Sequence, residues 1–253
     1  MSGRLQNKIA IITGAGRGIG AAIARAFAAE GANVVVAEMD EVTGTAVATE
    51  IGGIFCRCDV TVQLDVDRTI RETLDRFGRI DILVNNAGAN VFHRPHEMPR
   101  SEWARCMALD LEACWAMSEA VLPDMRCRRA GVILNIASTH GFKIIPHTFP
   151  YPVAKHGLIG LTRSLGIEYA AESIRVNAIA PGYIDTEIAR DYWAGFDDPA
   201  AERQRAENLH PPGRIGQPEE VAMTAVFLAS DEASFINAET ITIDGGRSAL
   251  FHD

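Results

Sequence analysis

Residues 8–20 read KIAIITGAGRGIG. Residues 9–13 are apolar or β-branched, which is typical of a buried strand, and glycines follow at positions 14, 16, 18 and 20. An alanine-rich helical pattern, AAIARAFAAEG, then occupies residues 21–31. Glycines let the backbone turn sharply and approach a ligand, and the start of a helix offers free N–H groups and partial positive charge. The strand–turn–helix order therefore predicts a site for a phosphate or a dinucleotide.

Outward from this stretch, strand and helix patterns alternate along the chain. This alternation is typical of a parallel sheet with helices on both faces. The sequence predicts an α/β fold, a single-domain Rossmann-type doubly wound parallel sheet of about seven strands that spans residues 1–253. The expected strands are 8–14, 32–38, 54–60, 81–88, 131–138, 174–182 and 239–246, and the expected helices are 21–31, 66–78, 101–125, 151–170 and 218–230.

One region, residues 183–217, does not follow the alternation. It is too long for a simple connection, and it follows the carboxyl end of a strand, where open sheets bind ligands. We expect either a substrate-loop insertion or a helical excursion on the surface.

Bulk properties restrict the partners. The chain has 253 residues and a formal net charge of −9, so nucleic acid and anionic membranes are not expected partners. No apolar stretch approaches the roughly 20 residues that span a bilayer, and the N-terminus does not read as a signal peptide. Five irregularly spaced cysteines predict reduced thiols and no metal site. These features favour a cytoplasmic protein that acts on a small molecule.

Two acids follow strands in positions suited to a nucleotide. Glu38 lies 18 residues after Gly20, close to the ~20-residue offset at which an acid accepts hydrogen bonds from an adenosine ribose. A carboxylate there repels a 2′-phosphate, so NAD is favoured; Arg17 could attract that phosphate, which leaves NADP open. Asp59 is a candidate for the adenine edge, with a turn acid as the alternative.

A tyrosine and a lysine are held one helical turn apart in YPVAK, residues 151–155. Pro152 suits a first helical turn, which places Tyr151 at the start of the helix with Lys155 on the same side. A free phenol titrates near pH ~10, and a neighbouring ammonium favours the phenolate. A phenol whose pKa is lowered in this way could exchange a proton with an alcohol. Ser138 ends a strand 13 residues earlier and could hold the substrate oxygen.

Taken together, the motifs resemble those of the short-chain dehydrogenase/reductase family over nearly the whole chain. The matching motifs are TGAGRGIG (13–20), Asp59, NNAG (85–88), Ser138, YPVAK (151–155), PGYIDT (181–186), RIGQPEEVA (214–222) and IDGG (243–246).

The resemblance implies hydride transfer with NAD(P), Tyr151 as acid/base, Lys155 as its activator and ribose ligand, and Ser138 as the orienting hydroxyl. It implies a homotetramer that associates through the helices at about 101–125 and 151–170. The implied coenzyme-binding residues are Gly14, Arg17, Gly18, Ile19, Gly20, Glu38, Asp59, Val60, Asn86, Ala87, Gly88, Tyr151, Lys155, Pro181, Gly182, Ile184 and Thr186.

One position departs from the family pattern. The family usually has an asparagine in the long helix, and this chain has Asp110 in the stretch Ala108–Leu111. We include Asp110 in the catalytic set and hypothesise that it acts through its main-chain carbonyl, in a water relay to Lys155. In that case Asp110→Asn leaves the pH–rate profile nearly unchanged. An ionised carboxylate near Lys155 would instead oppose the phenolate.

The substrate is inferred from two segments, NVFHRP (90–95) and THGFKIIPHTF (139–149), and from the insertion. Their polar and cationic side chains favour a sugar, a polyol or a 2-keto-3-deoxy sugar acid over an apolar substrate. Arg94, Lys143 or a histidine could pair with a carboxylate. The candidate substrate residues are Asn90, Arg94, His140, Lys143, His147, Thr148, Tyr183 and Trp193.

Two other functions stay open. A 3-oxoacyl-[acyl-carrier-protein] reductase shares these motifs, but it favours NADPH and a basic docking patch, and both Glu38 and the net charge of −9 oppose it. A non-catalytic nucleotide-sensing protein could use the same fold, but it has no need of the complete set of Ser138, Tyr151 and Lys155.

Overall fold

The structure, a computed structural model, describes residues 3–251. A seven-stranded parallel sheet in the order β3-β2-β1-β4-β6-β8-β9 forms its centre, which confirms the predicted fold class. The strands are β1 Ile9–Thr13, β2 Asn33–Glu38, β3 Ile54–Arg57, β4 Ile82–Asn85, β6 Gly131–Ile136, β8 Ile174–Pro181 and β9 Thr240–Ile243. The helices are α1 Gly18–Ala29, α2 Glu41–Ile51, α3 Gln63–Phe77, α4 Arg100–Met107, α5 Ala113–Arg128, α6 Tyr151–Tyr169, α7 Glu187–Ala194, α8 Pro199–Asn208 and α9 Pro218–Ala229.

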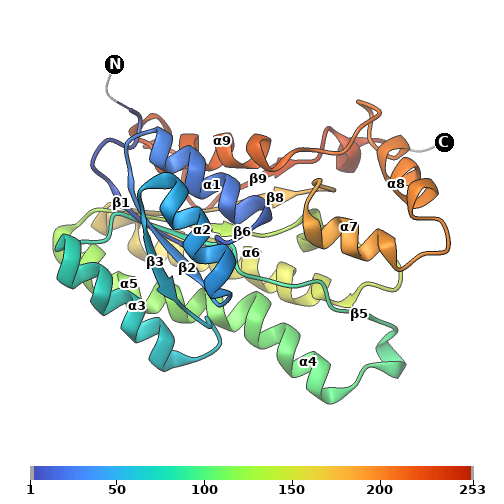
Figure 1. Cartoon of the computed structure of the whole chain (residues 1–253), viewed down its shortest axis with the longest axis horizontal. Coiled ribbons are helices and arrows are strands. Elements are labelled where there is room, and N and C mark those ends of the chain that lie inside the picture. Colours follow the sequence, from blue (N-terminus) through green and yellow to red (C-terminus); the bar gives the residue numbers. More distant parts are fainter. Residues whose placement is uncertain (1–2, 252–253) are drawn as a thin grey trace.

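Helices cover both faces of the sheet, with α1 and α9 on one side and α3 and α5 on the other (Figure 1). Neighbouring residues of β1 point to opposite faces, because side chains alternate along a strand. Ile12 packs with Phe27 of α1 in one core, and Ile11 packs with Met117 of α5 in the other. The continuous apolar strands follow from this double burial.

Two helical regions differ from the sequence prediction. No helix was expected between the second and third strands, where α2 lies. Its signals are an Asp40 side chain that accepts hydrogen bonds from the N–H groups of Val42 and Thr43, and a left-handed Gly52 at its end. The predicted helix 101–125 runs from Arg100 to Arg128, and a π-helical segment, Ala108–Glu112, interrupts it between α4 and α5.

The region 183–217, which breaks the sequence alternation, contains α7 and α8 (at the right of Figure 1). It follows β8 directly. A second short pairing, β5 Phe92–His93 with β7 Phe149–Pro150, is antiparallel and lies outside the main sheet. These elements stand beyond the carboxyl ends of the strands. Because all seven strands are parallel, these ends share one edge, and the strand order reverses between β1 and β4. Ligands bind at such a switch point.

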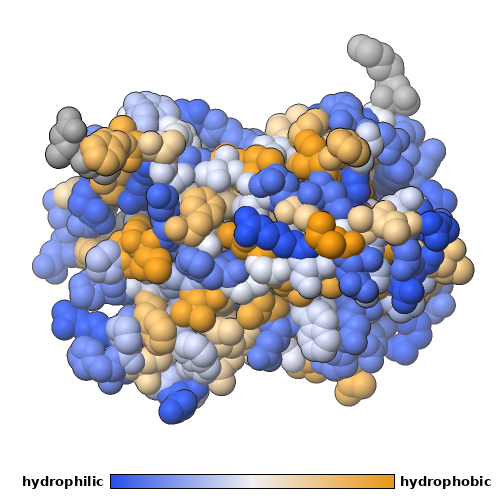
Figure 2. Space-filling model, turned by 180° about the vertical axis from the view of Figure 1, so that it is seen from behind, coloured by the Kyte–Doolittle hydropathy of each residue, from blue (hydrophilic) through white to orange (hydrophobic). Residues whose placement is uncertain are grey.

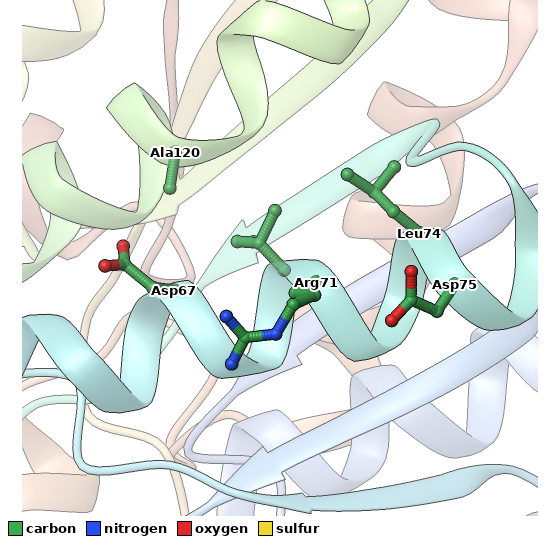
Figure 3. A pocket seen from close by; sticks show the side chains of 6 residues that line it. Asp67, Arg71, Leu74, Asp75 and Ala120 are labelled. Atoms are coloured by element: carbon green, nitrogen blue, oxygen red, sulfur yellow. The ribbon is translucent and has the colours of Figure 1, made fainter.

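The outer surface carries little that suggests a second site. The face behind that of Figure 1 shows several separate groups of apolar side chains among polar ones (Figure 2). A shallow depression of about 310 Å³ lies between α3 and α5 and is lined by Asp67, Ile70, Arg71, Leu74, Asp75 and Ala120 (Figure 3). Its lining contains no serine, threonine, cysteine, lysine or histidine. Among residues 3–251, no helix is long and apolar enough to cross a membrane. All five cysteines are free thiols.

Candidate functional site

A cavity of about 940 Å³ opens at the carboxyl edge of the sheet. Residues that are distant in sequence line it together: the glycine turn after β1, the ends of β2 and β4, the segment after β6, the start of α6, and α7. This volume lies in the range of small-molecule and cofactor sites. In the part of the chain that the structure describes, no group of three or more His, Cys, Asp or Glu side chains could hold a metal ion.

The glycine turn forms a backbone cradle at one end of the cavity. Gly14 and Gly18 have φ angles of +62° and +55°, a conformation that favours glycine. A Cβ atom at Gly20 would stand 2.2 Å from the carbonyl oxygen of Gly14, so the turn needs glycine there. The Asn86 side chain donates hydrogen bonds to the carbonyl oxygens of Thr13 and Gly14, both at 3.0 Å. The end of β4 therefore fixes the turn.

Glu38 faces this turn. Its carboxylate accepts hydrogen bonds from the N–H groups of Gly16 (3.0 Å), Met39 (2.8 Å) and Asp40 (3.1 Å). Asp59 also lines the cavity, and its carboxylate accepts hydrogen bonds from the N–H and hydroxyl of Thr61. A glycine cradle at a helix N-terminus, with an acid held beside it, fits a dinucleotide.

Ser138, Tyr151 and Lys155 line the same cavity. Tyr151 is the first residue of α6, as its proline neighbour predicts, and the edges of the Phe92 and His140 rings lie against it. The Lys155 ammonium lies 5.4 Å from the centroid of the Tyr151 ring and donates a hydrogen bond to the carbonyl oxygen of Ile136 at 3.2 Å. The Ser138 hydroxyl accepts a hydrogen bond from the N–H of His140 at 3.1 Å. Phenol, ammonium and hydroxyl thus border one cavity.

The protein alone does not lower the pKa of the Tyr151 phenol, contrary to the sequence prediction. Burial raises that pKa above its ordinary value, and Asp110 adds to the increase. Lys155 acts in the expected direction, as does hydrogen bonding with Ser138, but burial outweighs both. A further positive charge in the cavity would therefore favour the phenolate.

Asp110 contacts Lys155 with its side chain. Asp110 is fully buried in the π-helical segment, and its Oδ1 lies 3.4 Å from Lys155 Nζ. It also accepts hydrogen bonds from the N–H of Ala89 (3.3 Å) and from the thiol of Cys106 (3.8 Å). Burial works to lower the pKa of Lys155, but Tyr151 and Asp110 outweigh it and raise that pKa. The hypothesis that Asp110 acts through its main chain alone does not include this ion pair. An unchanged pH–rate profile is therefore no longer the expected result of Asp110→Asn.

We now expect Asp110→Asn to shift the pH dependence of alcohol oxidation. Asparagine removes a negative charge that opposes the phenolate, so the pKa of Tyr151 falls. Because oxidation needs the phenolate, the acidic limb of kcat/KM moves to lower pH by about one unit. Profiles of the wild type, Asp110→Asn and the exposed control Asp67→Asn measure this. If the pH profiles of the wild type and Asp110→Asn coincide, Asp110 acts through its main-chain carbonyl and not through its side chain.

The candidate substrate residues divide into two groups. Arg94 and Lys143 are exposed and do not line the cavity, so their predicted placement is wrong. Arg94 follows the short strand β5 and leads into an exposed 3-10 turn, and Lys143 lies in an exposed loop. The residues that do line the cavity are Asn90, His140, His147, Thr148, Tyr183 and Trp193.

Two of the residues that line the cavity are also engaged elsewhere. Trp193 is 4% exposed and packs with Ala206 and Ile215 in the small core under α7 and α8. The Thr148 hydroxyl donates a hydrogen bond to the carbonyl oxygen of Ile145 at 2.6 Å. Trp193 therefore also holds the insertion together.

Sequence reasoning missed further residues that line the cavity. Tyr192 and Phe196 come from the insertion, and no periodic signal separated them from its surface residues. Arg247 directly follows the IDGG motif, and its position after a strand end was an available signal. The missed residues include Phe92, Arg105, Tyr192, Phe196, Glu202, Arg205 and Arg247.

Comparison with known proteins agrees with these motifs. A family model described as "Enoyl-(Acyl carrier protein) reductase" matches residues 14–248. L-fucose dehydrogenase from Bos taurus is 39% identical over 251 residues, which cover 97% of this chain and 91% of the relative. The chain belongs to the short-chain dehydrogenase/reductase family. It is therefore an oxidoreductase of a family that generally uses NAD(P).

Other members of the short-chain dehydrogenase/reductase family differ in the substrates that their names give. A 3-oxoacyl-[acyl-carrier-protein] reductase from Chlamydia muridarum is 36% identical over 256 residues, covering 98% of this chain and 100% of that protein. The ligand-free aldohexose dehydrogenase of Thermoplasma acidophilum superposes with a TM-score of 0.89 at 34% identity, covering 99% of this chain and 98% of that one. The relatives thus fix the family and leave the substrate open.

Proposed function

We propose that this protein transfers a hydride between a nicotinamide coenzyme and a secondary alcohol or ketone of a small polar substrate. The substrate class is a sugar, a polyol or a sugar acid. The observation that carries the proposal is one cavity, bordered at one end by the glycine cradle and at the other by Ser138, Tyr151 and Lys155. When bound, NAD(P)⁺ supplies the hydride acceptor and a positive charge.

Tyr151, Lys155 and Ser138 have separate roles in the proton transfer. The Tyr151 phenolate takes the hydroxyl proton of the alcohol while the carbinol hydrogen leaves as hydride, and the ketone remains. In the reverse direction the phenol returns the proton to the alkoxide. Lys155 favours the phenolate, and Ser138 holds the substrate oxygen beside it. Burial raises the pKa of this phenol, and the positive charge of a bound NAD(P)⁺ would favour its phenolate form.

NAD is the proposed coenzyme, and Glu38 is its proposed selector. The carboxylate is held by three backbone N–H groups at the cradle, where it would repel a 2′-phosphate. Glu38→Gln removes the charge, so we expect kcat/KM with NADP⁺ to rise about tenfold and that with NAD⁺ to fall about tenfold. Steady-state rates with both coenzymes measure this, with the exposed Glu41→Gln as control. A wild type that prefers NADP⁺ would contradict the assignment.

A 3-oxoacyl-[acyl-carrier-protein] reductase is the second candidate, because relatives with that name match nearly the whole chain. Against it stand the Glu38 carboxylate in the cavity and the net charge of −9, since an acidic carrier protein needs a basic docking surface. A nucleotide-sensing protein without catalysis is a weaker alternative, because the chain keeps the complete set of Ser138, Tyr151 and Lys155 around one cavity.

A substrate panel separates these functions. Wild-type protein is mixed with NAD⁺ or NADP⁺ and a series of sugars, polyols and sugar acids, and reduced nicotinamide is followed by its absorbance. Acetoacetyl-CoA with NADH or NADPH forms the reductase arm. We expect turnover of a polyhydroxylated alcohol. Turnover of the thioester alone would favour the carrier-protein reductase, and coenzyme binding without any turnover would favour the sensor.

The remaining proposals concern the domain organisation, the oligomeric state and the location of the protein. We propose one catalytic domain over residues 1–253, with 183–217 as its substrate loop, because α7 lines the cavity. We also propose a homotetramer that associates through α5 and α6, which carry the exposed apolar residues Trp115 (51% exposed), Val153 (41%) and Ile167 (72%). A cytoplasmic location stays a prediction.

A further inference from the structure

Five basic side chains line the cavity: Arg17, Arg105, Lys155, Arg205 and Arg247. Three of them are paired with acids. Arg105 lies 2.7 Å from Glu102, Arg205 lies 2.8 Å from Glu202, and Lys155 lies 3.4 Å from Asp110. The acid of an ion pair offsets much of the positive charge of its cation, so a paired cation attracts an anionic ligand less strongly. Arg17 has a different place, because it lies in the glycine cradle at the coenzyme end. Arg247 therefore stands apart from the other four.

Arg247 makes no ion pair with any acid of residues 3–251. Its guanidinium lies 5.0 Å from the centroid of the Tyr183 ring, within the range of a cation–π contact. The backbone around it is fixed, because the Asp244 carboxylate accepts hydrogen bonds from the N–H groups of Gly246 (2.9 Å) and Ser248 (2.7 Å). The backbone that carries the cation is thus held in place, and the cation forms no ion pair with an acid of residues 3–251.

His140 lines the same cavity as Arg247 and lies at its reacting end. Its ring centroid lies 5.7 Å from that of Tyr151. Burial, together with the positive charge of Arg247, lowers the pKa of His140 to about 4, so the ring is neutral at pH 7. Its Nδ1 is buried and has no hydrogen-bond partner among the described residues. The cavity thus combines one neutral polar ring beside Tyr151 with the positive charge of Arg247.

We propose that Arg247 is the anion subsite of this enzyme and binds the carboxylate of its substrate, while His140 meets a hydroxyl between the carboxylate and the reacting carbon. The substrate is then a hydroxy acid or its keto form, not a neutral sugar. A planar guanidinium suits a carboxylate because it can donate two parallel hydrogen bonds. This inference rests on the proposed function and narrows it.

The test compares acids with neutral compounds of the same shape. The probes are D-gluconate with sorbitol, D-galactonate with galactitol, and 3-hydroxybutyrate with 1,3-butanediol, each with NAD⁺ and NADP⁺. In the wild type we expect kcat/KM to favour an acid over its neutral partner. In Arg247→Met, KM for the acid should rise about 100-fold with kcat changed by less than about fivefold, because the lost contact is remote from the reacting carbon. The neutral compound should be unaffected.

Two further variants sharpen the test. Arg247→Lys keeps the charge but loses the paired hydrogen bonds, so it should recover part of the loss. Arg94→Met is the matched control, because Arg94 is exposed and lies outside the cavity. Equal KM values for an acid in wild type and Arg247→Met, or a wild type that turns over only neutral compounds, would overturn the anion subsite and leave the proposed function standing. Failure of the wild type with every alcohol would overturn both.

Discussion

Replacing Tyr151 by phenylalanine is expected to lower kcat about 1,000-fold while coenzyme binding stays within about twofold of the wild type. The ring keeps its contacts with Phe92 and His140, so only the hydroxyl is lost. General acid–base catalysis by one positioned group is worth about 10²–10⁴-fold in rate, and the phenol is the group proposed to carry the proton. Steady-state kinetics and titration with reduced coenzyme measure the two quantities.

Tyr169→Phe is the control for this substitution. Tyr169 lies at the far end of α6, where its ring packs under the Arg126 guanidinium at 5.6 Å. The Tyr169→Phe variant should keep the wild-type kcat. A Tyr151→Phe variant with more than a tenth of the wild-type kcat would show that another group carries the proton. A variant that loses coenzyme binding as well would point to a structural role for the hydroxyl.

Replacing Lys155 by methionine should cost both activity and stability. Lys155 is 4% exposed and Asp110 is fully buried, so the variant leaves a carboxylate in the interior without its cation. Breaking a buried ion pair from one side costs about 3–5 kcal/mol. The rate should fall about 100-fold or more, because the phenolate loses its positive neighbour. Urea unfolding and oxidation kinetics measure the two losses.

The double variant Lys155→Met with Asp110→Asn separates the two effects. Removing both charges should recover most of the lost stability, because no buried charge remains unpaired. Activity should stay far below that of the wild type, since the phenol still lacks the ammonium. Equal instability of the single and double variants would show that the 3.4 Å contact contributes nothing to the fold.

The sequence predicted the sheet because seven apolar runs are separated by helical patterns or turns, and both faces of a parallel sheet are buried. The sequence prediction missed α2, because the mixed composition of this weakly amphipathic helix gives little apolar periodicity. The Asp40 cap was its clearest signal. The sequence prediction also missed the π-helical segment around Asp110, because such segments are rare and only about one turn long.

For the site, residues that the sequence ties to a strand end or a helix start, such as Glu38, Ser138 and Tyr151, do line the cavity. Sequence reasoning placed Arg94 and Lys143 in the cavity from loop position alone, and loop residues can turn either way. The family resemblance brought Asp110 near Lys155 as an alternative, but the residue pattern does not report the ion pair itself, which joins residues 45 positions apart through the packing of two helices. The pKa of Tyr151 depended on burial, which the sequence does not report.

The most direct test of the account is the fate of the carbinol hydrogen. Once the panel identifies an alcohol substrate, it is prepared with deuterium at the carbon that bears the hydroxyl and is oxidised with unlabelled NAD⁺ in ordinary water. Hydride transfer within the cavity predicts that the deuterium is recovered on the nicotinamide ring, in the same amount as the ketone formed, and that Tyr151→Phe nearly abolishes both products. Deuterium released into the solvent, or ketone formed without reduced coenzyme, would contradict it.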